Sequence, residues 1–162
     1  MKTALITGSF DPITRGHLDL IRRTAALFER VEVVIFRNSE KKPMFSEAER
    51  LAWLSAVCRE AGENVRVAVS DDTVANYAKE RGIRLIVKGV RNAADLAYEQ
   101  DMAALNRMAG ECETLFLPTD PSLSFVSSSA VREFLRRGLD ARELLPEVIA
   151  EDVVAAYAAR VD

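Results

Sequence analysis

The sequence has one histidine, two cysteines, no long apolar run and no excess of positive charge. Cys58 and Cys112 lie far apart and His17 is the single histidine, so nothing predicts a cluster of metal ligands. The 22 basic residues are outnumbered by 25 acidic ones, and the net charge of −3 provides no global positive field to attract nucleic acid or an anionic membrane. Any affinity for phosphate must therefore be local.

The cysteine content and the N-terminal sequence bear on the compartment. Two isolated cysteines are expected to be buried free thiols in a reducing environment. Residues 1–3 lead into a short apolar run and not into a signal-length one, and no run reaches membrane-spanning length. We expect a soluble cytoplasmic protein that binds neither membrane nor nucleic acid.

The 162 residues are 49% hydrophobic, which is enough for one substantial core, so we expect a single domain, residues 1–162. Short runs typical of strands alternate with longer runs typical of helices. This pattern predicts an α/β fold: one doubly wound, Rossmann-like domain with a five-stranded parallel sheet and helices on both faces. The expected strands are 3–7, 31–36, 65–69, 85–87 and 114–117, and the expected helices are 16–28, 46–60, 73–80, 93–109, 129–137 and 147–159.

The stretch 8–17, with the sequence GSFDPITRGH, connects the first predicted strand to the first predicted helix. Gly8 is expected to let the backbone approach a ligand closely, and Pro12 to stiffen the turn. The free N–H groups at a helix start bind anions. His17 falls at this start, where either a neutral imidazole or an imidazolium is able to donate a hydrogen bond to a phosphate oxygen.

Polar residues also follow other predicted strands, at the edge where open parallel sheets bind ligands. A single lysine here would be an ordinary surface residue, but together with His17 the loops predict a phosphate-binding edge. These residues are Ser9 and His17 after the first strand, Lys41 and Lys42 after the second, Lys88, Gly89 and Arg91 after the fourth, and Ser127, Ser128 and Ser129 after the fifth.

Three of the predicted helices carry further signals. One serine suffices as an N-cap, so the run Ser127–Ser129 indicates a second anion site. Ser46 and Glu49 form a capping-box signature at the start of another helix. Glu99 either accepts a ribose hydroxyl or is a solvated carboxylate. Its helix also has an apolar stripe that we expect in the core, formed by Tyr98, Met102, Leu105 and Ala109.

The run 7–12 with Gly16 and His17 resembles the TxGxFDPxHxGH-type motif of the nucleotidyltransferase superfamily, and Ser127–Ser129 resembles its second motif, of the ISSTxxR type. Within that superfamily the sequence is similar to the family of bacterial phosphopantetheine adenylyltransferases over nearly its whole length. The closer similarity lies in Asp11–Thr14, Lys41–Phe45, Gly89–Arg91, Tyr98–Glu99, Asn106–Arg107 and Phe125–Ser129.

The resemblance implies transfer of an AMP group from ATP to 4′-phosphopantetheine, giving dephospho-CoA and pyrophosphate, the penultimate step of coenzyme A synthesis. It also implies Mg²⁺ as cofactor, with no metal ligand assigned to the chain, feedback inhibition by coenzyme A, and a homohexamer built as a dimer of trimers. The attacking phosphate oxygen is already ionised, so direct in-line attack needs no covalent enzyme intermediate.

The resemblance assigns His17, Lys41 and Arg91 as catalytic residues. His17 is expected to stabilise the pentacoordinate phosphorus, Lys41 and Lys88 to hold the attacking phosphate, and Arg91 to hold the leaving pyrophosphate. The expected phosphopantetheine contacts are Ser9, Lys41, Val74, Lys88 and Asn106. The expected ATP contacts are Ser9, Phe10, His17, Gly89, Val90, Arg91, Glu99, Leu123, Ser124, Phe125, Val126, Ser127, Ser128 and Ser129.

Three residues depart from the usual family pattern. Lys88 stands where arginine is usual, so it holds phosphate without a bidentate fork. Arg15 replaces a common asparagine, and Leu123 replaces an aromatic residue near the adenine, which exchanges stacking for aliphatic contact. These departures bear on affinity more than on the type of reaction.

Two alternatives stay open. A nicotinate mononucleotide adenylyltransferase or a CDP-alcohol cytidylyltransferase would share both motifs, although Thr14 and residues 41–45 argue against them. The other alternative is a regulatory nucleotide-binding domain without catalysis. Binding alone, however, does not require donors on both sides of the α-phosphate.

Overall fold

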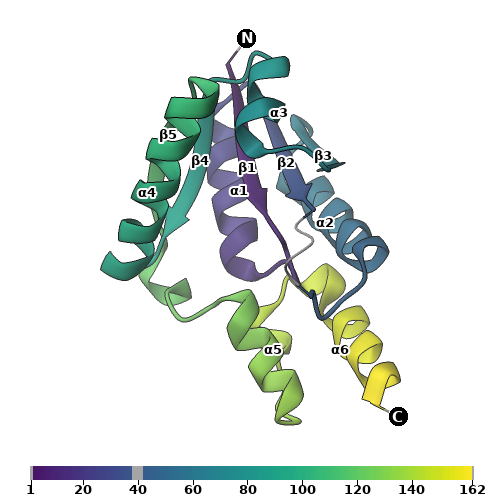
Figure 1. Ribbon diagram of the computed structural model, residues 1–162. Coiled ribbons are helices and arrows are strands. Elements are labelled where there is room, and N and C mark those ends of the chain that lie inside the picture. Colours follow the sequence, from purple (N-terminus) through teal and green to yellow (C-terminus); the bar gives the residue numbers. More distant parts are fainter. Residues whose placement is uncertain (1, 38–41, 162) are drawn as a thin grey trace.

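The computed structural model describes residues 2–37 and 42–161, which form a parallel sheet with helices on both faces (Figure 1). The strands are β1 (Thr3–Gly8), β2 (Arg30–Phe36), β3 (Val65–Ser70), β4 (Leu85–Val90) and β5 (Glu113–Pro118). Their order in the sheet is β3-β2-β1-β4-β5. The predicted five-stranded, doubly wound α/β class is confirmed. Because the strand order reverses next to β1, a ligand crevice is expected between the carboxyl ends of β1 and β4.

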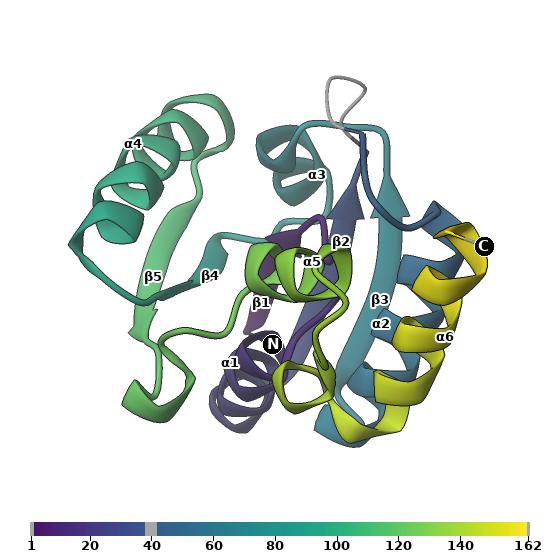
Figure 2. The same cartoon turned by 90° about the horizontal axis from the view of Figure 1, so that it is seen from below.

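The helices divide between the two faces of the sheet (Figure 2). One face is covered by α1 (Arg15–Leu27), α2 (Glu47–Ala61) and α6 (Glu147–Val161), and the other by α3 (Val74–Glu80) and α4 (Ala93–Gly110). A further helix, α5 (Ser128–Arg136), lies below the carboxyl ends of the strands in Figure 1. Short 3₁₀ turns at Pro121–Leu123 and Arg142–Leu144 complete the connections. Among the described residues, no helix is both long and apolar enough to cross a membrane.

The central strands are buried on both sides, which explains their nearly continuous apolar sequence. Ala4 and Ile6 of β1 pack into the cluster shared with α1, α2 and α6, whereas Leu5 packs into the cluster shared with α3. This alternation is the two-residue period of a strand. Cys58 and Cys112 are buried and unpaired, as the sequence predicted.

Strand β4 is three residues longer than predicted. Lys88 and Gly89 were expected after the strand, but together with Val90 they pair in register with residues 116–118 of β5. Pairing satisfies the backbone N–H and C=O groups, and this gain outweighs the low strand propensity of lysine and glycine. Lys88 and Gly89 therefore approach the crevice from the strand itself.

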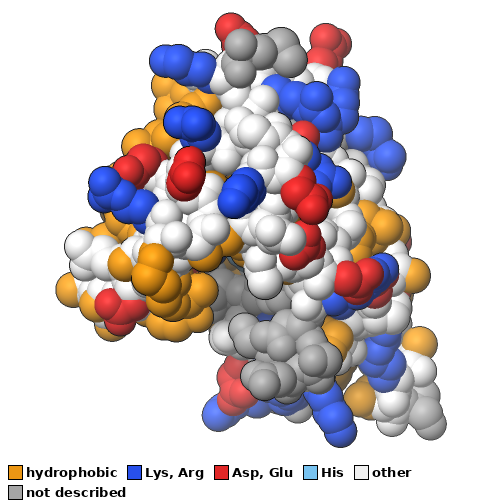
Figure 3. All heavy atoms as spheres, turned by 45° about the horizontal axis from the view of Figure 1, so that its top comes forward, with side chains coloured by type: hydrophobic (Ala, Val, Ile, Leu, Met, Phe, Trp, Pro, Cys, Tyr) orange, Lys and Arg blue, Asp and Glu red, His pale blue; other side chains and the backbone are white. Residues whose placement is uncertain are grey.

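The apolar stripe of α4 does not belong to the core, and that prediction was wrong. Tyr98 is 62% exposed and Leu105 is 53% exposed, and Met108 beside them is 80% exposed. Figure 3 shows apolar side chains gathered on the side of the molecule where α4 lies. Helix α4 covers the edge of the sheet, so only a narrow part of its surface contacts β4 and β5. The stripe correctly marks an apolar face, but nothing in residues 2–37 and 42–161 covers it.

Candidate active site

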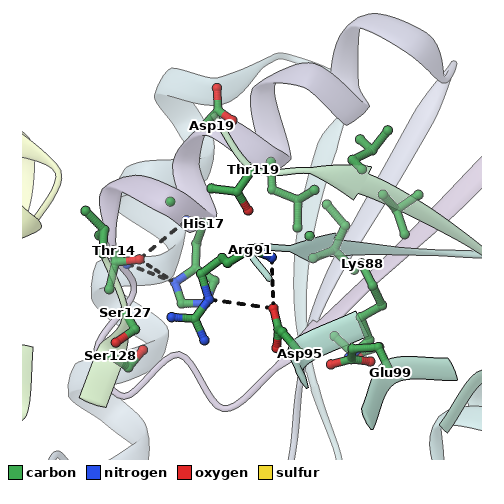
Figure 4. A pocket seen from close by; sticks show the side chains of 18 of the residues that line it. Thr14, His17, Asp19, Lys88, Arg91, Asp95, Glu99, Thr119, Ser127 and Ser128 are labelled. Carbon is green, nitrogen blue, oxygen red and sulfur yellow. Dashed lines mark hydrogen bonds and ion pairs between the residues drawn. The ribbon is translucent and has the colours of Figure 1, made fainter. Parts of the chain in front are cut away.

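A cavity of about 370 Å³ opens at the carboxyl ends of β1, β4 and β5, at the expected switch point (Figure 4). The starts of α1 and α5 and the first turns of α4 border it. Among the predicted site residues, those that line this cavity are Ser9, His17, Lys88, Gly89, Arg91, Glu99, Val126, Ser127, Ser128 and Ser129. The loops after the first, fourth and fifth predicted strands therefore meet at one cavity, whereas Lys42, from the loop after the second, does not line it.

The ring of His17 is oriented by the cap of its own helix. Thr14 is the N-cap of α1, and its backbone N–H donates to Nδ1 of His17 over 3.0 Å. A backbone N–H only donates, so Nδ1 is an acceptor and the proton of the neutral ring resides on Nε2. The rings of Phe10 and His17 pack in a T-shaped arrangement, with centroids 5.1 Å apart.

The environment of His17 keeps the imidazole neutral. Burial, followed by the charges of Arg91 and Lys88, lowers the pKa of His17 from 6.5 to about 4. The sequence left open whether this histidine is an imidazole or an imidazolium. At neutral pH it is a neutral donor whose Nε2–H is not used by the cap.

Two pairs, each of one cation and one carboxylate, lie on the wall of the cavity. Nζ of Lys88 lies 3.5 Å from Oε2 of Glu99, and Nε of Arg91 lies 3.6 Å from Oδ2 of Asp95. In Figure 4 the Arg91 side chain lies between His17 and Asp95. Glu99 is thus not a solvated carboxylate, because its side chain is 15% exposed and lies next to Lys88.

The serine turn, residues Ser127–Ser129, connects the beginnings of α5 and α1. Ser127 is the N-cap of α5 and accepts a hydrogen bond from the N–H of Ala130. The Ser128 hydroxyl donates to the carbonyl oxygen of Pro12 over 2.7 Å. The two helix N-termini are therefore neighbours on one cavity, and both direct N–H groups and positive dipole ends towards it.

Buried charges fix the loop after β1 in place. The carboxylate of Asp11 accepts hydrogen bonds from the N–H groups of Met44 and Phe45 at 2.8 and 2.9 Å. Arg132 donates to the carbonyl oxygen of Asp11, and Arg50 donates to that of Ser9. These side chains tie the first motif to the segment before α2 and to α5. Sequence reasoning gave them no role.

Gly8 lies behind the cavity wall and packs against an aromatic ring. A Cβ atom at this position would lie 3.1 Å from the Phe10 ring, so any other residue would displace that ring by a few tenths of an ångström, and Gly8 itself does not line the cavity. Gly89 borders the cavity, and a Cβ there would contact Leu20 and Thr119 at 3.5 and 3.8 Å. Of the two, Gly89 is the glycine next to ligand space.

Other predicted contacts lie away from this cavity. Phe10 is buried behind His17, Val74 packs against the core on the α3 side, and Leu123 packs against the core on the α1 side. Lys41 lies outside the described residues. The remaining predicted contacts that do not line the cavity are Val90, Asn106, Ser124 and Phe125.

Of the departures from the family pattern, only Lys88 borders the cavity. Arg15 turns away and donates to the carbonyl oxygen of Glu143 over 3.0 Å. Leu123 contributes to the core. The effect of the unusual residues on the site is thus concentrated at Lys88.

Several lining residues were not predicted. Arg132 is the last residue of the second motif and Asp95 occupies the first turn of α4, whereas Asp19 and Arg23 lie on α1. The spacing of Gly16, Asp19 and Arg23 at three and four residues would have placed all three on one face of α1. The final arginine of the ISSTxxR-type motif was a second available signal.

Comparison with known proteins gives one family and consistent relatives. The cytidylyltransferase-like family model matches residues 5–134. A phosphopantetheine adenylyltransferase from Rubrobacter xylanophilus is 44% identical over 97% of this chain and 96% of its own, and one from Bifidobacterium longum is 41% identical over 98% and 96%.

Solved structures share the fold at lower identity. A lipopolysaccharide core biosynthesis protein from Thermoplasma volcanium matches with a TM-score of 0.51 and 23% identity, over 74% of this chain and 97% of its own. TmcAL from Thermotoga maritima, bound with alpha-thio ATP, matches with a TM-score of 0.62 and 13% identity, over 99% of this chain and 56% of its own. At these identities the likeness shows the fold alone.

Proposed function

The chain belongs to the cytidylyltransferase-like family, and to the phosphopantetheine adenylyltransferases within it, and we propose that it transfers the adenylyl group of ATP to 4′-phosphopantetheine. The observation that carries the proposal is the convergence of His17, Lys88, Arg91 and the serine turn on one cavity. The identity of the acceptor follows from the relatives. We infer that residues 1–162 act as one domain of a cytoplasmic enzyme of coenzyme A synthesis.

The proposed reaction is a single displacement at phosphorus. A phosphate oxygen of phosphopantetheine forms a bond to the α-phosphorus of ATP, and the bond from this phosphorus to the oxygen bridging the β-phosphate breaks. The products are dephospho-CoA and pyrophosphate. The nucleophile is already an anion, so the chain must align the two phosphates and offset their charge, without an activated side chain.

The geometry favours a division of roles. The Nε2–H of His17 is the donor for an oxygen on the pentacoordinate α-phosphorus, because Nδ1 is held by Thr14. Lys88 binds the acceptor phosphate, and Arg91 with the serine turn binds the leaving pyrophosphate. Arg132 adds a further positive charge at the cavity. The proposed role of Lys41 beside the acceptor phosphate rests on the resemblance alone.

The side chains present fit magnesium that arrives on ATP. Asp19, Asp95 and Glu99 line the cavity, but each is next to a cation. Within residues 2–37 and 42–161 there is no group of three metal-binding side chains. Mg²⁺ at phosphate sites is commonly held by one or two carboxylates, water and the phosphates themselves. When bound, the ion would offset charge on the triphosphate, and the Asp19 carboxylate on the cavity wall would be a protein ligand for it.

We propose the hexamer as the working assembly, and the outer face of α4 supports it. Besides the exposed stripe, a groove beside α4 and β5 includes Met108 and Thr114, and the buried hydroxyl of Thr114 has no hydrogen-bond partner in the described part of the chain. A second copy would cover the apolar surface. Coenzyme A, which contains the product, is proposed to inhibit at the acceptor side of the same cavity.

The experiment that tests the function is an acceptor comparison. Pyrophosphate release is measured with ATP and each of phosphopantetheine and nicotinate mononucleotide, and with CTP and an alcohol phosphate. We expect release only with ATP and phosphopantetheine, together with formation of dephospho-CoA. Release with another pair would assign the chain to a different transferase, and ATP binding without release from any pair would make it a regulatory domain.

A further inference from the structure

Asp95 makes two contacts with a single residue. Its Oδ2 atom accepts a hydrogen bond from the backbone N–H of Arg91 over 3.2 Å, and the same atom lies 3.6 Å from Nε of the Arg91 side chain. Its own backbone N–H donates to Asn92, the N-cap of α4. Asp95 therefore sits at the start of α4 with its carboxylate directed back to Arg91, on the wall of the cavity (Figure 4).

We propose that Asp95 is a positioning residue that holds Arg91 at the cavity when no nucleotide is bound and competes with phosphate for it afterwards, so that pyrophosphate is bound weakly enough to leave. This inference rests on the proposed function, because it takes pyrophosphate as the leaving group. It assigns a role to a carboxylate for which the sequence motifs predicted none.

The distance between the Arg91 and Asp95 side chains suits an ion pair in which phosphate is able to replace the carboxylate. At 3.6 Å the contact between Nε and the carboxylate is longer than a charge-assisted hydrogen bond, so the guanidinium keeps most of its donors for another anion. The Arg91 and Asp95 side chains are 35% and 23% exposed, which keeps the pair weak. Phosphate offers a second negative partner with better geometry for the fork of arginine.

The neighbouring turn of α4 repeats the arrangement. Glu99 follows Asp95 by four residues, on the same helix face, and lies beside Lys88. Lys88 lies in β4 and Arg91 directly follows this strand, so each of these two cations has a carboxylate of α4 next to it. Lone cations in an empty cavity would repel one another, and these carboxylates offset that repulsion until substrate phosphates enter.

The test measures binding of pyrophosphate by titration calorimetry to the full chain and to Asp95→Asn. Asparagine retains an acceptor for the N–H of Arg91 and removes the charge. We expect Asp95→Asn to bind pyrophosphate about twofold to fivefold more tightly, the range expected for loss of a partly exposed ion pair. In steady state the variant should show stronger product inhibition by pyrophosphate.

Two comparisons separate this role from others. Asp101→Asn makes the same charge change on the exposed surface of α4, outside the cavity, and should bind pyrophosphate like the unchanged chain. In an Arg91→Ala background, Asp95→Asn should have no further effect, because the competition acts through Arg91. Asp95→Ser, which also retains a short acceptor, is measured alongside in case asparagine impairs folding, which thermal denaturation detects.

The possible results distinguish failure of the role proposed for Asp95 from failure of the proposed function. If the unchanged chain binds pyrophosphate and the variants at position 95 bind it equally or more weakly, Asp95 does not compete for Arg91. The same gain in Asp101→Asn, or in the Arg91→Ala background, would also overturn the inference while leaving the function intact. If the unchanged chain binds neither ATP nor pyrophosphate, both proposals fail.

Discussion

A single imidazole shows how local structure turns a residue type into a defined chemical group. His17 is the only histidine of the chain, and the sequence places it at a helix start. The N-cap contact then fixes the proton on Nε2, and burial with two neighbouring cations keeps the ring neutral. The result is a fixed neutral donor, which is suited to an oxygen that gains charge during displacement at phosphorus.

Replacing this donor should affect turnover more than binding. We expect His17→Ala to lower kcat by about a hundredfold or more, the scale of losing one preorganised donor, while ATP affinity changes little. Steady-state kinetics and calorimetry with ATP check the two effects separately. His17→Gln, whose amide can place a donor near Nε2, should retain more activity than alanine. An unchanged kcat in His17→Ala would exclude the assigned role.

The low pKa of His17 also predicts a pH dependence of stability. The folded chain has this pKa at about 4 and the unfolded chain at 6.5, so between these values the unfolded chain binds more protons. Stability is therefore lost as the pH falls from 6.5 towards 4. The contribution of His17 between pH 7.5 and 5 should be about 1 to 2 kcal/mol after screening by solvent.

Urea denaturation at both pH values measures this contribution. His17→Gln has no group that titrates in this range and should lose less free energy of unfolding on acidification than the unchanged chain. Carboxylates contribute equally to both proteins, so the difference between them isolates the imidazole. Equal losses would mean that the ring is not desolvated.

Lys88 is the family departure that borders the cavity, and its effect is measurable. Arginine at this position would add a bidentate fork for the acceptor phosphate, so Lys88→Arg should lower KM for phosphopantetheine by about threefold to tenfold. Lys88→Met, which keeps the aliphatic stem, should raise it. Steady-state kinetics with varied phosphopantetheine gives both values. A change in KM for ATP alone would place Lys88 on the nucleotide instead.

At the scale of elements, helix starts both stabilise the fold and build the site. The capping box predicted at Ser46 and Glu49 is confirmed, and a second box at α1 joins Thr14 to His17. The sequence signature of a capping box is a serine or threonine followed three residues later by a glutamate or glutamine. Because histidine occupies that place in α1, this box was not predicted, although it orients the proposed donor.

The two boxes allow a matched test. Thr14→Ala and Ser46→Ala should each lower the free energy of unfolding by about 1 kcal/mol through loss of an N-cap. Only Thr14→Ala should also lower kcat, because it removes the Thr14 hydroxyl that lies 3.0 Å from Nδ1 of His17, whereas Ser46 lies outside the cavity. Denaturation and kinetics are measured on both, and Thr14→Ser should restore activity. Equal kinetic losses would show a general effect of instability.

At the scale of the whole molecule, much of the fold could be predicted because the hydrophobic periodicity of strands and helices is a local property of the sequence. Alternating apolar runs gave the strands and helices, and the carboxyl-end rule placed Ser9, His17, Arg91 and the serine turn at one edge. Strand β4 was underestimated because pairing with β5 is a nonlocal interaction. Asp95 and Arg132 were missed because only the assembled sheet shows which helix turns border the cavity.

The exposed apolar stripe of α4 is not explained by the packing of a single chain. Periodicity identifies an apolar face but not whether its partner belongs to the same molecule, and here the wrong assignment of Tyr98 and Leu105 to the core is itself informative. Large apolar side chains that gather on a surface commonly mark an interface between proteins. The proposed hexamer supplies such a partner as further copies of the chain.

Charge substitution on α4 tests this assembly. Leu105→Glu and Met108→Glu alter residues that are 53% and 80% exposed, so the single chain should still fold, but a buried interface would then contain unpaired carboxylates. Light scattering after gel filtration should give six chains of 18.0 kDa for the unchanged protein and fewer for both variants. Leu27→Glu, with 67% exposure at the end of α1, is the matched control and should leave the mass unchanged. Assembly that survives both α4 substitutions would mean that the copies meet through another surface, and that the stripe on α4 faces water in the working enzyme.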